Sequence, residues 1–384
     1  MPSKVQCRHC GTWLGDERPA AFVTSPALFG DVSSGGASKV PDVFRPHARL
    51  YCTTRALGAA ATAVPQFVDG GTTPLTAGDF LRAIAPDLSG RSHKGEGGRV
   101  GVIGGSEDYT GAPFYAAHSA LRAGAELVSV YTADAAAGPI KSYSPELMVT
   151  AVYAVADMQE GGRKGAVADM VRAVEAALPR LHVLVVGPGL GRNPRVLESV
   201  AAIIEAAKLR ELPIVIDADG LWLINERPSL VRGYTRAVLT PNAMEFRRLA
   251  SAVLGRDRET TATGPELAVA LGGPIVFQKG PGDRICTPDG AVLEGSERGA
   301  PKRPGGLGDM LCGVIAAVLP WAIAADKSSS WACVAAGEVA RRACQHAFNK
   351  RGRSLVAPDV IDELGRAFEE FCPTERDQKA GSSL

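Results

Sequence analysis

Residues 303–319 of the chain, RPGGLGDMLCGVIAAVL, place a glycine-rich turn and one aspartate directly before an apolar run. Glycines remove side chains where a ligand must approach the backbone, and the unpaired N–H groups at a helix start attract anions such as phosphate. Asp309 therefore has two interpretations. It is either a helix-terminal carboxylate that suits the helix dipole or a reactive group beside a bound phosphate. The other motifs of the chain decide between the two.

Two further glycine-rich loops follow apolar strands. The first, GGSEDYTGAPFYAAHSALRAGA, leaves the backbone bare at Gly104, Gly105 and Gly111 before a helix of small residues. These glycines serve either a ligand or the tight packing of that helix on a sheet, and both interpretations stay open. The second, GPGLGR at residues 187–192, has glycines spaced for close backbone approach to a ligand. It is not a Walker sequence, because the chain has no Gly-Lys-Ser or Gly-Lys-Thr ending.

Residues 240–246, TPNAMEF, end another strand and open a helix. Asn242 and Glu245 have the spacing of a capping box, in which each side chain satisfies a backbone N–H group of the helix start. In a second interpretation, Glu245 orients a metal-bound water beside phosphates, because Mg²⁺ usually keeps several waters and is held through carboxylates. The sequence favours neither interpretation over the other.

Basic residues stand at two further candidate phosphate positions. FQKGPGD, at residues 277–283, places Lys279 at the end of a strand, where its ammonium group either meets phosphate or lies exposed beside a turn. RGAPKRP, at residues 298–304, precedes the glycine-rich turn. Its cations either neutralise phosphate or form a solvated face, and the second interpretation is favoured for Arg298, Lys302 and Arg303.

These loops fall between short apolar runs that alternate with helical patterns. The runs, mostly expected to be strands buried on both faces, are RVGVIGG, AELVSVYT, ELMVTAV, HVLVVGPG, PIVIDAD, AVLTPN and PIVFQKG. The helices are expected near residues 112–122, 166–178, 195–209 and 243–252, with three more that start near Asp309, Ser330 and Pro358. DRICTPDGAVLEGS is expected to form a hairpin that turns at Pro288, Asp289 and Gly290.

The alternation of strands and helices predicts a doubly wound, mostly parallel sheet with helices on both faces and without a second domain. Ligands bind such sheets outside the carboxyl ends of the strands. The glycine-rich loops lie at those ends, so the predicted fold would bring them to one edge of the sheet.

The composition favours a globular protein that acts on a small molecule. The chain of 384 residues has 42 basic and 41 acidic residues, so no overall field attracts nucleic acid or an anionic membrane. The longest apolar stretch, residues 313–325, is interrupted by Pro320 and falls short of the about 20 residues that a membrane-spanning helix needs. We therefore expect a soluble protein with no nucleic-acid or membrane partner.

The eight cysteines are scattered, and Cys312, Cys333 and Cys344 fall within apolar helical patterns. This usage indicates reduced, intracellular thiols that pack as small apolar side chains. CRHC, at residues 7–10, has the spacing of half a zinc knuckle, but no second pair follows it, and no metal site is expected there. The six histidines form no cluster that would suit zinc or a catalytic triad.

Residues 1–72 are rich in Ala, Gly, Ser and Pro without sustained periodicity, and we expect them to form a poorly ordered extension. Residues 43–67 carry arginines and no acidic residue, as in an organellar presequence, although acidic residues precede them. The expected localisation is cytoplasmic, with mitochondrial targeting as the alternative. The expected organisation is this extension, a domain at residues 73–373 and a polar tail at residues 374–384.

Taken in order, the motifs of residues 75–371 resemble those of the NAD(P)H-hydrate dehydratase family, ribokinase-like enzymes that repair hydrated NADH and NADPH. The match is carried by KGEGGRVGVIGGSEDYTGAPFYAA, GPGLGR, VIDADGL, TPNAMEF, KGPGD and GGLGDMLCG. The ordered set is specific, whereas each motif alone would be weak. TPNAMEF and the Gly-Gly-x-Gly-Asp loop resemble the eukaryotic, ATP-using branch more than the bacterial, ADP-using one.

The resemblance implies a ribokinase-like three-layer α/β/α sandwich and a hydro-lyase reaction. ATP would phosphorylate the hydroxyl at C6 of the S-form of the hydrated nicotinamide, after which phosphate leaves and the double bond returns. Asp309 would accept the hydroxyl proton, and backbone N–H groups of the preceding loop would hold the phosphoryl group. The residues implied to contact the hydrated cofactor are Gly189, Asn242, Ala243, Met244, Glu245, Phe246, Arg247, Arg248 and Asp309. Those implied to contact ATP are Lys279, Gly280, Pro281, Gly282, Asp283, Gly305, Gly306, Leu307 and Gly308.

The family further implies Mg²⁺ as cofactor, held without a direct protein ligand unless Glu245 acts through water. Asp219 would lie near the substrate pocket. Leu307 departs from the small or polar residue that relatives tend to carry, which puts a side-chain contact or the size of the nucleotide pocket in doubt. A separate epimerase would act on the same metabolite, because residues 1–72 are too few to form that domain. A homo-oligomer is also expected.

Two alternatives remain at this point. Another ribokinase-like kinase, for a hydroxymethylpyrimidine or a sugar, would need the same aspartate and anion-binding loop. The pair GGSEDYTGAP and GPGLGR resembles the dehydratase and not those kinases. A non-catalytic nucleotide-binding protein on the same fold is the second alternative, and the presence of both Asp309 and Lys279 argues against it.

Overall fold

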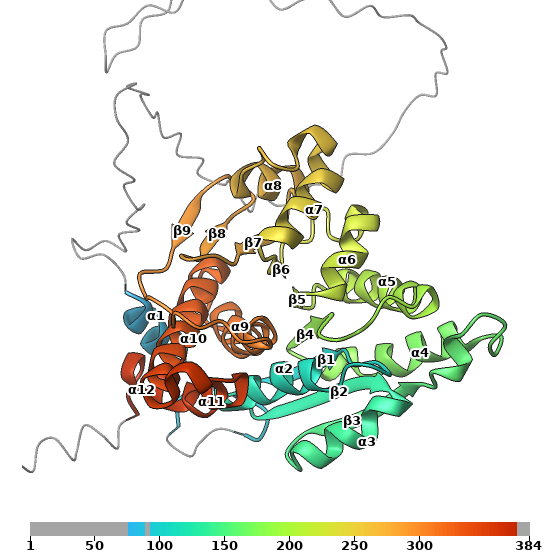
Figure 1. The fold of residues 1–384 in the computed structure, drawn as a ribbon, viewed down its shortest axis with the longest axis horizontal. Coiled ribbons are helices and arrows are strands. Elements are labelled where there is room, and N and C mark those ends of the chain that lie inside the picture. Colours follow the sequence, from blue (N-terminus) through green and yellow to red (C-terminus); the bar gives the residue numbers. More distant parts are fainter. Residues whose placement is uncertain (1–75, 89–92, 375–384) are drawn as a thin grey trace, which may run out of the picture. The chain divides into compact units, whose positions relative to one another are not determined.

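The computed structural model describes residues 76–88 and 93–374, all of which belong to the unit Ala60–Leu384. Within this part of the chain the strands form a nine-stranded sheet in the order β3-β2-β1-β4-β5-β6-β7-β8-β9 (Figure 1). All neighbours from β3 to β7 are parallel, and β8 and β9 add an antiparallel hairpin at one edge. The strands are β1 (Arg99–Ile103), β2 (Leu127–Ala133), β3 (Met148–Tyr153), β4 (Val183–Val186), β5 (Ile214–Ile216), β6 (Ala237–Leu239), β7 (Ile275–Gln278), β8 (Arg284–Cys286) and β9 (Val292–Glu294).

Both faces of the central strands are apolar, so helices cover both. In β4, Val183 and Val185 face one core, while Leu184 and Val186 face the other. The first core is covered by α1 (Ala77–Ile84), α2 (Gly111–Arg122), α3 (Asp134–Tyr143), α9 (Leu307–Ala324), α10 (Ser329–Arg351), α11 (Ala357–Asp362) and α12 (Leu364–Phe371). The second is covered by α4 (Ala166–Glu175), α5 (Pro194–Leu209), α6 (Asp219–Glu226), α7 (Ala243–Leu254) and α8 (Gly264–Leu271). The predicted doubly wound, three-layer α/β/α architecture is confirmed.

The strand order reverses at β1. From β1 the chain moves to β2 and β3 on one side, and then returns to place β4 on the other side of β1. In open α/β sheets ligands commonly bind beside such a reversal, outside the carboxyl ends of the strands. The loops after β1 and β4 are the two that begin GGSEDYTGAP and GPGLGR, and the Gly105 N–H donates to the Pro188 carbonyl at 2.9 Å.

Several local expectations differ from the structure. Four helices of 8 to 10 residues, α1, α3, α6 and α8, are not among the expected ones; α3, α6 and α8 are short and only weakly amphipathic. The single helix expected from Pro358 is two, because α11 ends at Asp362 and α12 begins at Leu364. The run ELMVTAV forms β3, which lies at the sheet edge and is largely exposed rather than buried on both faces. The hairpin of β8 and β9 is confirmed.

Helix α9 is the one described helix that is long and apolar enough, by length and composition, to cross a membrane, and 72% of it is buried inside the protein. It continues through Pro320 and lies against α2 and α10, so it is a core helix of the sandwich (Figure 1). Its Cys312 and, in α10, Cys333 and Cys344 are free and buried, as the helical patterns predict. The CRHC stretch and the whole extension at residues 1–72 lie outside the described residues.

Candidate active site

Three neighbouring strands end in polar residues that meet at one point. Asp217 follows β5, Thr240 follows β6 and Lys279 follows β7. The Lys279 Nζ donates to Asp217 Oδ1 at 2.7 Å, and the Thr240 hydroxyl donates to the same oxygen at 2.9 Å. Asp217 is 2% exposed. The carboxyl edge of the parallel sheet therefore carries a buried, hydrogen-bonded lysine–aspartate pair.

Asp217, which none of the sequence motifs singled out, belongs to the charged site, and Asp219, predicted near the substrate pocket, lines a hollow beside Glu245. Ala218 separates the two with a φ of 47°, a conformation that costs energy for any residue with a Cβ. The turn sends Asp217 toward Lys279, while Asp219 accepts the Gly191 N–H at 3.0 Å and the Arg192 Nε–H at 3.1 Å. Asp219 therefore holds the GPGLGR loop. The signal that could have found Asp217 is its position as the first acid after a buried strand.

The start of α9 lies directly against the lysine–aspartate pair. A Cβ added at Gly308 would lie 3.1 Å from Lys279 Nζ and 3.4 Å from Asp217 Oδ2, so a side chain at this position would crowd the lysine–aspartate pair. Gly306, the residue before the helix, has a φ of 91°, a left-handed conformation that also suits glycine. The structure thus brings the glycine-rich turn, Lys279 and Asp309 to one place, as predicted.

Leu307, the unusual residue of this turn, points its side chain into the protein. It is partly buried and packs against the core on the α9 side of the sheet. Its side chain therefore contributes packing at the first turn of α9, and the backbone N–H groups at residues 306–308 keep the positions that a helix start offers to an anion.

The site has an excess of negative charge. Asp309 is largely buried, and this burial, reinforced by the nearby carboxylates of Asp217 and Glu245, raises its pKa to about 7, although Lys279 opposes the rise. The pKa of Glu245 is also raised, by burial first and by Asp217 second. Burial disfavours the charge on Lys279, but Asp217 and Glu245 outweigh it and raise the lysine pKa. Lys279 stays protonated, and Asp309 exchanges a proton near neutral pH.

The capping box predicted for Asn242 and Glu245 is present at the start of α7. The Asn242 side chain accepts the Met244 and Glu245 N–H groups at 2.9 and 3.0 Å, and Glu245 Oε2 accepts the Asn242 N–H at 2.8 Å. The same carboxylate oxygen lies 3.9 Å from Lys279 Nζ, so Glu245 serves both the helix start and the charged site. Phe246 differs from its neighbours, because its side chain is 5% exposed and packs in the core beneath α7.

Beside Glu245 lies a hollow of about 200 Å³ between α6 and α7. The guanidinium of Arg192 lies 4.0 Å from the centre of the Trp222 ring, and that of Arg248 lies 5.9 Å from it. The buried Oδ1 of Asn225, which also lines the hollow, has no hydrogen-bond partner among the described residues. The hollow thus combines an aromatic face, cations and an unused acceptor.

The loop after β1 packs against the loop after β4. Gly189 has a φ of 62°, and a Cβ there would lie 2.9 Å from Tyr109 Cβ. Gly189 therefore lets the GPGLGR loop pack closely against the loop after β1.

The predicted residues of the β7–β8 loop and of the basic stretch before α9 differ in what they contact. Gly280 N–H donates to Asp283 Oδ1 at 3.2 Å, and Asp283 Oδ2 accepts the Arg341 Nε–H at 2.6 Å. In the basic stretch before α9, Lys302 donates to the Arg353 carbonyl at 2.7 Å, whereas Arg298 and Arg303 are exposed. No group of three or more His, Cys, Asp or Glu side chains that could hold a metal ion occurs in residues 76–88 and 93–374.

A model of the NAD(P)H-hydrate dehydratase family matches residues 100–366. The chain belongs to this family. The ATP-dependent (S)-NAD(P)H-hydrate dehydratase of Bos taurus is 46% identical over 305 residues, which cover 76% of this chain and 88% of the relative. The Homo sapiens relative of the same name is 45% identical, with 77% and 84% covered. The Arabidopsis thaliana relative is 39% identical, with 79% and 87% covered.

Solved structures agree on the fold. A ribokinase-like superfamily protein from Enterococcus faecalis has a TM-score of 0.63 at 21% identity, covering 78% of this chain and 96% of that one. The ADP/ATP-dependent NAD(P)H-hydrate dehydratase from Bacillus subtilis, co-crystallised with ATP and Mg²⁺, has a TM-score of 0.58 at 23% identity, covering 81% and 100%. The predicted ribokinase-like fold is thereby confirmed, and the family membership sets aside the other small-molecule kinases.

Proposed function

We propose that this chain is an ATP-dependent dehydratase that restores NADH and NADPH from the S-forms of their hydrates. The observation that carries the proposal is the cluster at the carboxyl edge of the sheet: Asp309, with a pKa of about 7, lies beside the Lys279–Asp217 pair at a glycine-rich helix start. A general base is most effective when its pKa lies near the working pH, and a helix start stabilises a transferring phosphoryl group.

In the proposed reaction Asp309 takes the proton from the C6 hydroxyl of the hydrated nicotinamide. The oxygen attacks the γ-phosphorus of ATP, the bond to the β-phosphate oxygen breaks and ADP leaves. The C6–oxygen bond then breaks, inorganic phosphate leaves and the ring double bond returns with loss of a proton. Backbone N–H groups of Gly306, Leu307 and Gly308 would hold the phosphoryl group as negative charge shifts onto ADP.

Mg²⁺ fits the charge of this site. Three carboxylates, of Asp217, Glu245 and Asp309, surround a single ammonium group, so the site favours an added cation. Mg²⁺ commonly keeps several waters and binds through substrate phosphates and one or two carboxylates, which needs no cluster of protein ligands. Glu245 would contact the hydrated ion through water, and the ion would neutralise part of the phosphate charge.

The loops divide between the two substrates. We assign ATP to Lys279–Asp283 and Gly305–Gly308, and the hydrated dinucleotide to Gly189 and Asn242–Arg248. The hollow beside Glu245 supports the second assignment, because a dinucleotide carries an aromatic base and phosphates that suit Trp222 and the two arginines around it. In this assignment Phe246 acts through the packing of α7 rather than by side-chain contact.

The test is an absorbance assay at the nicotinamide band of NADH. Purified protein, Mg²⁺ and hydrated NADH or NADPH are mixed with ATP or with ADP, and ADP release is measured in parallel. We expect absorbance to return with ATP, with one ADP formed per cofactor restored. No recovery with either nucleotide would overturn the proposal, and recovery with ADP alone would overturn the choice of ATP.

We further propose that a separate epimerase supplies the S-form, that the chain forms a homo-oligomer and that it is cytoplasmic, with mitochondrial targeting as the alternative. The arginine-rich, acid-free composition of residues 43–67 supports the targeting alternative. A reporter protein fused behind residues 1–72 and located by microscopy would distinguish the two compartments. A diffuse reporter would support the cytoplasm, and co-localisation with a mitochondrial dye would support import.

A further inference from the structure

Helix α10 carries a row of polar residues on one of its faces. Glu338, Arg341, Arg342 and Gln345 stand at positions i, i+3, i+4 and i+7, which lie on one face of a helix. We call these four residues the polar face of α10. Glu338 is 7% exposed, and buried polar groups of this kind require partners. The partners show what the face does.

Arg341 holds the loop between β7 and β8. Its Nε donates to Asp283 Oδ2 at 2.6 Å, and its two terminal nitrogens donate to the carbonyls of Pro281 and Gly280 at 2.9 Å each. A peptide C=O and the following N–H point in opposite directions. Because the Pro281 carbonyl faces Arg341, the N–H of Gly282 is aimed away from α10.

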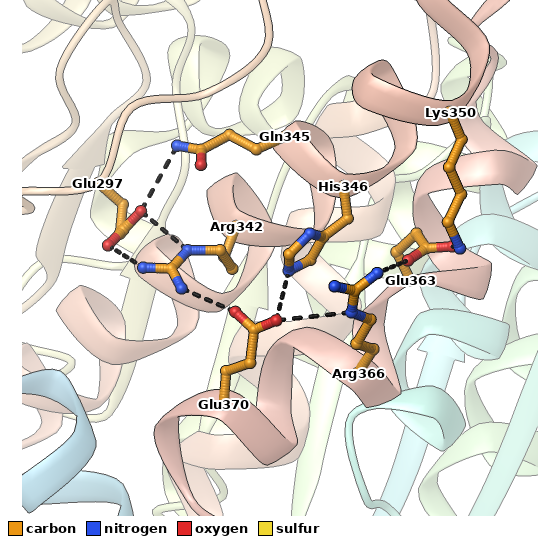
Figure 2. A network of polar contacts seen from close by, with 8 residues as sticks. All are labelled: Glu297, Arg342, Gln345, His346, Lys350, Glu363, Arg366 and Glu370. Atoms are coloured by element: carbon orange, nitrogen blue, oxygen red, sulfur yellow. Dashed lines mark hydrogen bonds and ion pairs between the residues drawn. The ribbon is translucent and has the colours of Figure 1, made fainter.

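The other three residues of the face hold the loop between β9 and α9. Glu338 Oε1 accepts the N–H and the hydroxyl of Ser296 at 2.7 and 2.9 Å. Arg342 donates to both oxygens of Glu297, at 3.2 and 2.6 Å, and Gln345 donates to the Arg298 carbonyl. Figure 2 shows the contacts of Glu297 with Arg342 and Gln345, together with the bond of Arg342 to Glu370 of α12, which fixes the arginine from its other side.

Both loops lead to the ATP-binding residues of the proposed function. The first contains Gly280–Asp283, and the second runs directly into Gly305–Gly308 at the start of α9. The two loops are therefore held by a single rigid surface, although they lie in different parts of the sequence. A loop that is fixed in its binding conformation loses less entropy when the ligand arrives, which raises affinity.

We propose that the polar face of α10 is a positioning element for ATP: it does not touch the nucleotide, but it sets the relative placement of the two loops that do. The inference rests on the assignment of these loops to ATP under the proposed function. Arg341 is the main positioning residue in this proposal. Its guanidinium bonds the Asp283 side chain and the carbonyls of Gly280 and Pro281.

Arg341→Met is the test variant, and Arg351→Met is its matched control. Arg351 belongs to the same helix, but its side chain pairs with Asp359 at 2.8 Å and makes no hydrogen bond or ion pair with either loop among the described residues. Displacement of positioning groups typically weakens a site by ten- to a hundredfold, so we expect Arg341→Met to raise the KM for ATP about tenfold or more. If only ATP binding is weakened, the kcat and the KM for the hydrate should each change less than about twofold. The control should match the parent protein in all three values.

Two further variants keep the inference open to refutation if Arg341→Met does not fold. Arg341→Lys keeps a cation beside Asp283 but lacks the planar fork, so it should fold and still raise the KM for ATP. Glu338→Gln keeps the acceptor for Ser296, whereas Glu338→Leu removes it. We expect the glutamine variant to retain the KM for ATP and the leucine variant to raise it. A purified, folded Arg341→Lys with an unchanged KM for ATP would overturn the inference.

The variant Gly282→Val shows whether an unchanged KM for ATP in Arg341→Lys means that α10 does not position the loop or that the loop does not bind ATP. A Cβ at Gly282 meets no atom within 4 Å and its φ is ordinary, so the fold should accept the substitution, while a bound nucleotide would collide with it. If Gly282→Val leaves ATP binding intact, the assignment of the loop is wrong and the inference falls with it. If Gly282→Val weakens ATP binding and Arg341→Lys does not, the assignment stands and only the role of α10 is refuted.

Discussion

Replacement of Asp309 by asparagine separates the two interpretations of this carboxylate. Asparagine keeps the size of the side chain and its place in the first turn of α9, but it cannot accept the hydroxyl proton. Loss of a general base typically lowers kcat by about 10² to 10⁴. A helix-terminal carboxylate without a catalytic role would instead contribute about 0.3–1 kcal/mol of stability and leave turnover unchanged.

The structure also predicts how the same substitution changes stability with pH. The native protein holds a proton on Asp309 up to about pH 7, whereas the unfolded chain releases it near the ordinary aspartate pKa of about 4. Between these values the native state binds more protons, so this group lowers the free energy of unfolding as the pH rises. At about 1.4 kcal/mol per pKa unit the full effect is roughly 4 kcal/mol, and partial solvent screening reduces it to about 2–4 kcal/mol. Asp309→Asn should therefore gain stability over the parent above pH 7.

Two measurements check this prediction. Turnover is followed by the return of nicotinamide absorbance, and stability by urea unfolding at pH 5 and pH 8, with the exposed Asp257→Asn as the matched control. For the parent protein, kcat/KM should rise with pH through about 7 as Asp309 ionises. A folded Asp309→Asn with near-parental turnover would refute the role of base. A stability difference that does not change between the two pH values would refute the raised pKa.

Three other variants test the rest of the site. Asp217→Asn removes the strongest charge that raises the pKa of Asp309, so the acidic limb of the kcat/KM profile should move to lower pH by about one unit. An acidic limb that does not move would show that the Asp217 carboxylate does not raise the pKa of Asp309. Gly308→Ala places a methyl group 3.1 Å from Lys279 Nζ and should lower kcat about tenfold. The control Gly138→Ala adds a Cβ that meets nothing within 4 Å, so kcat should stay at the parental value. Deletion of residues 1–70 should leave kcat and KM within about twofold, because this segment lacks the apolar periodicity of a core element, and a folded but inactive product would show otherwise.

The sequence by itself determined the parts of this protein that depend on local order. Buried strands of a parallel sheet need continuous apolar runs, so VLVV at residues 183–186 could be assigned without a structure. The capping box of Asn242 and Glu245 joins residues three positions apart, and such contacts follow from spacing alone. The placement of the glycine-rich loops at one edge of the sheet followed from the alternation of strands and helices, because parallel strands all end on the same side.

Only the tertiary structure decided which charged groups face one another. Asp217 and Asp219 are indistinguishable in the sequence DAD. Because Ala218 between them has a positive φ, the first carboxylate contacts Lys279 and the second contacts the GPGLGR loop. The polar face of α10 meets loops far away in the sequence, so no spacing rule could reveal the contact of Arg341 with Asp283. The pKa of Asp309 is likewise a property of the fold, because it depends on burial and on charges that arrive from separate strands and from α7. Electrostatic energies depend on distance in space and on exclusion of water, and chain order specifies neither.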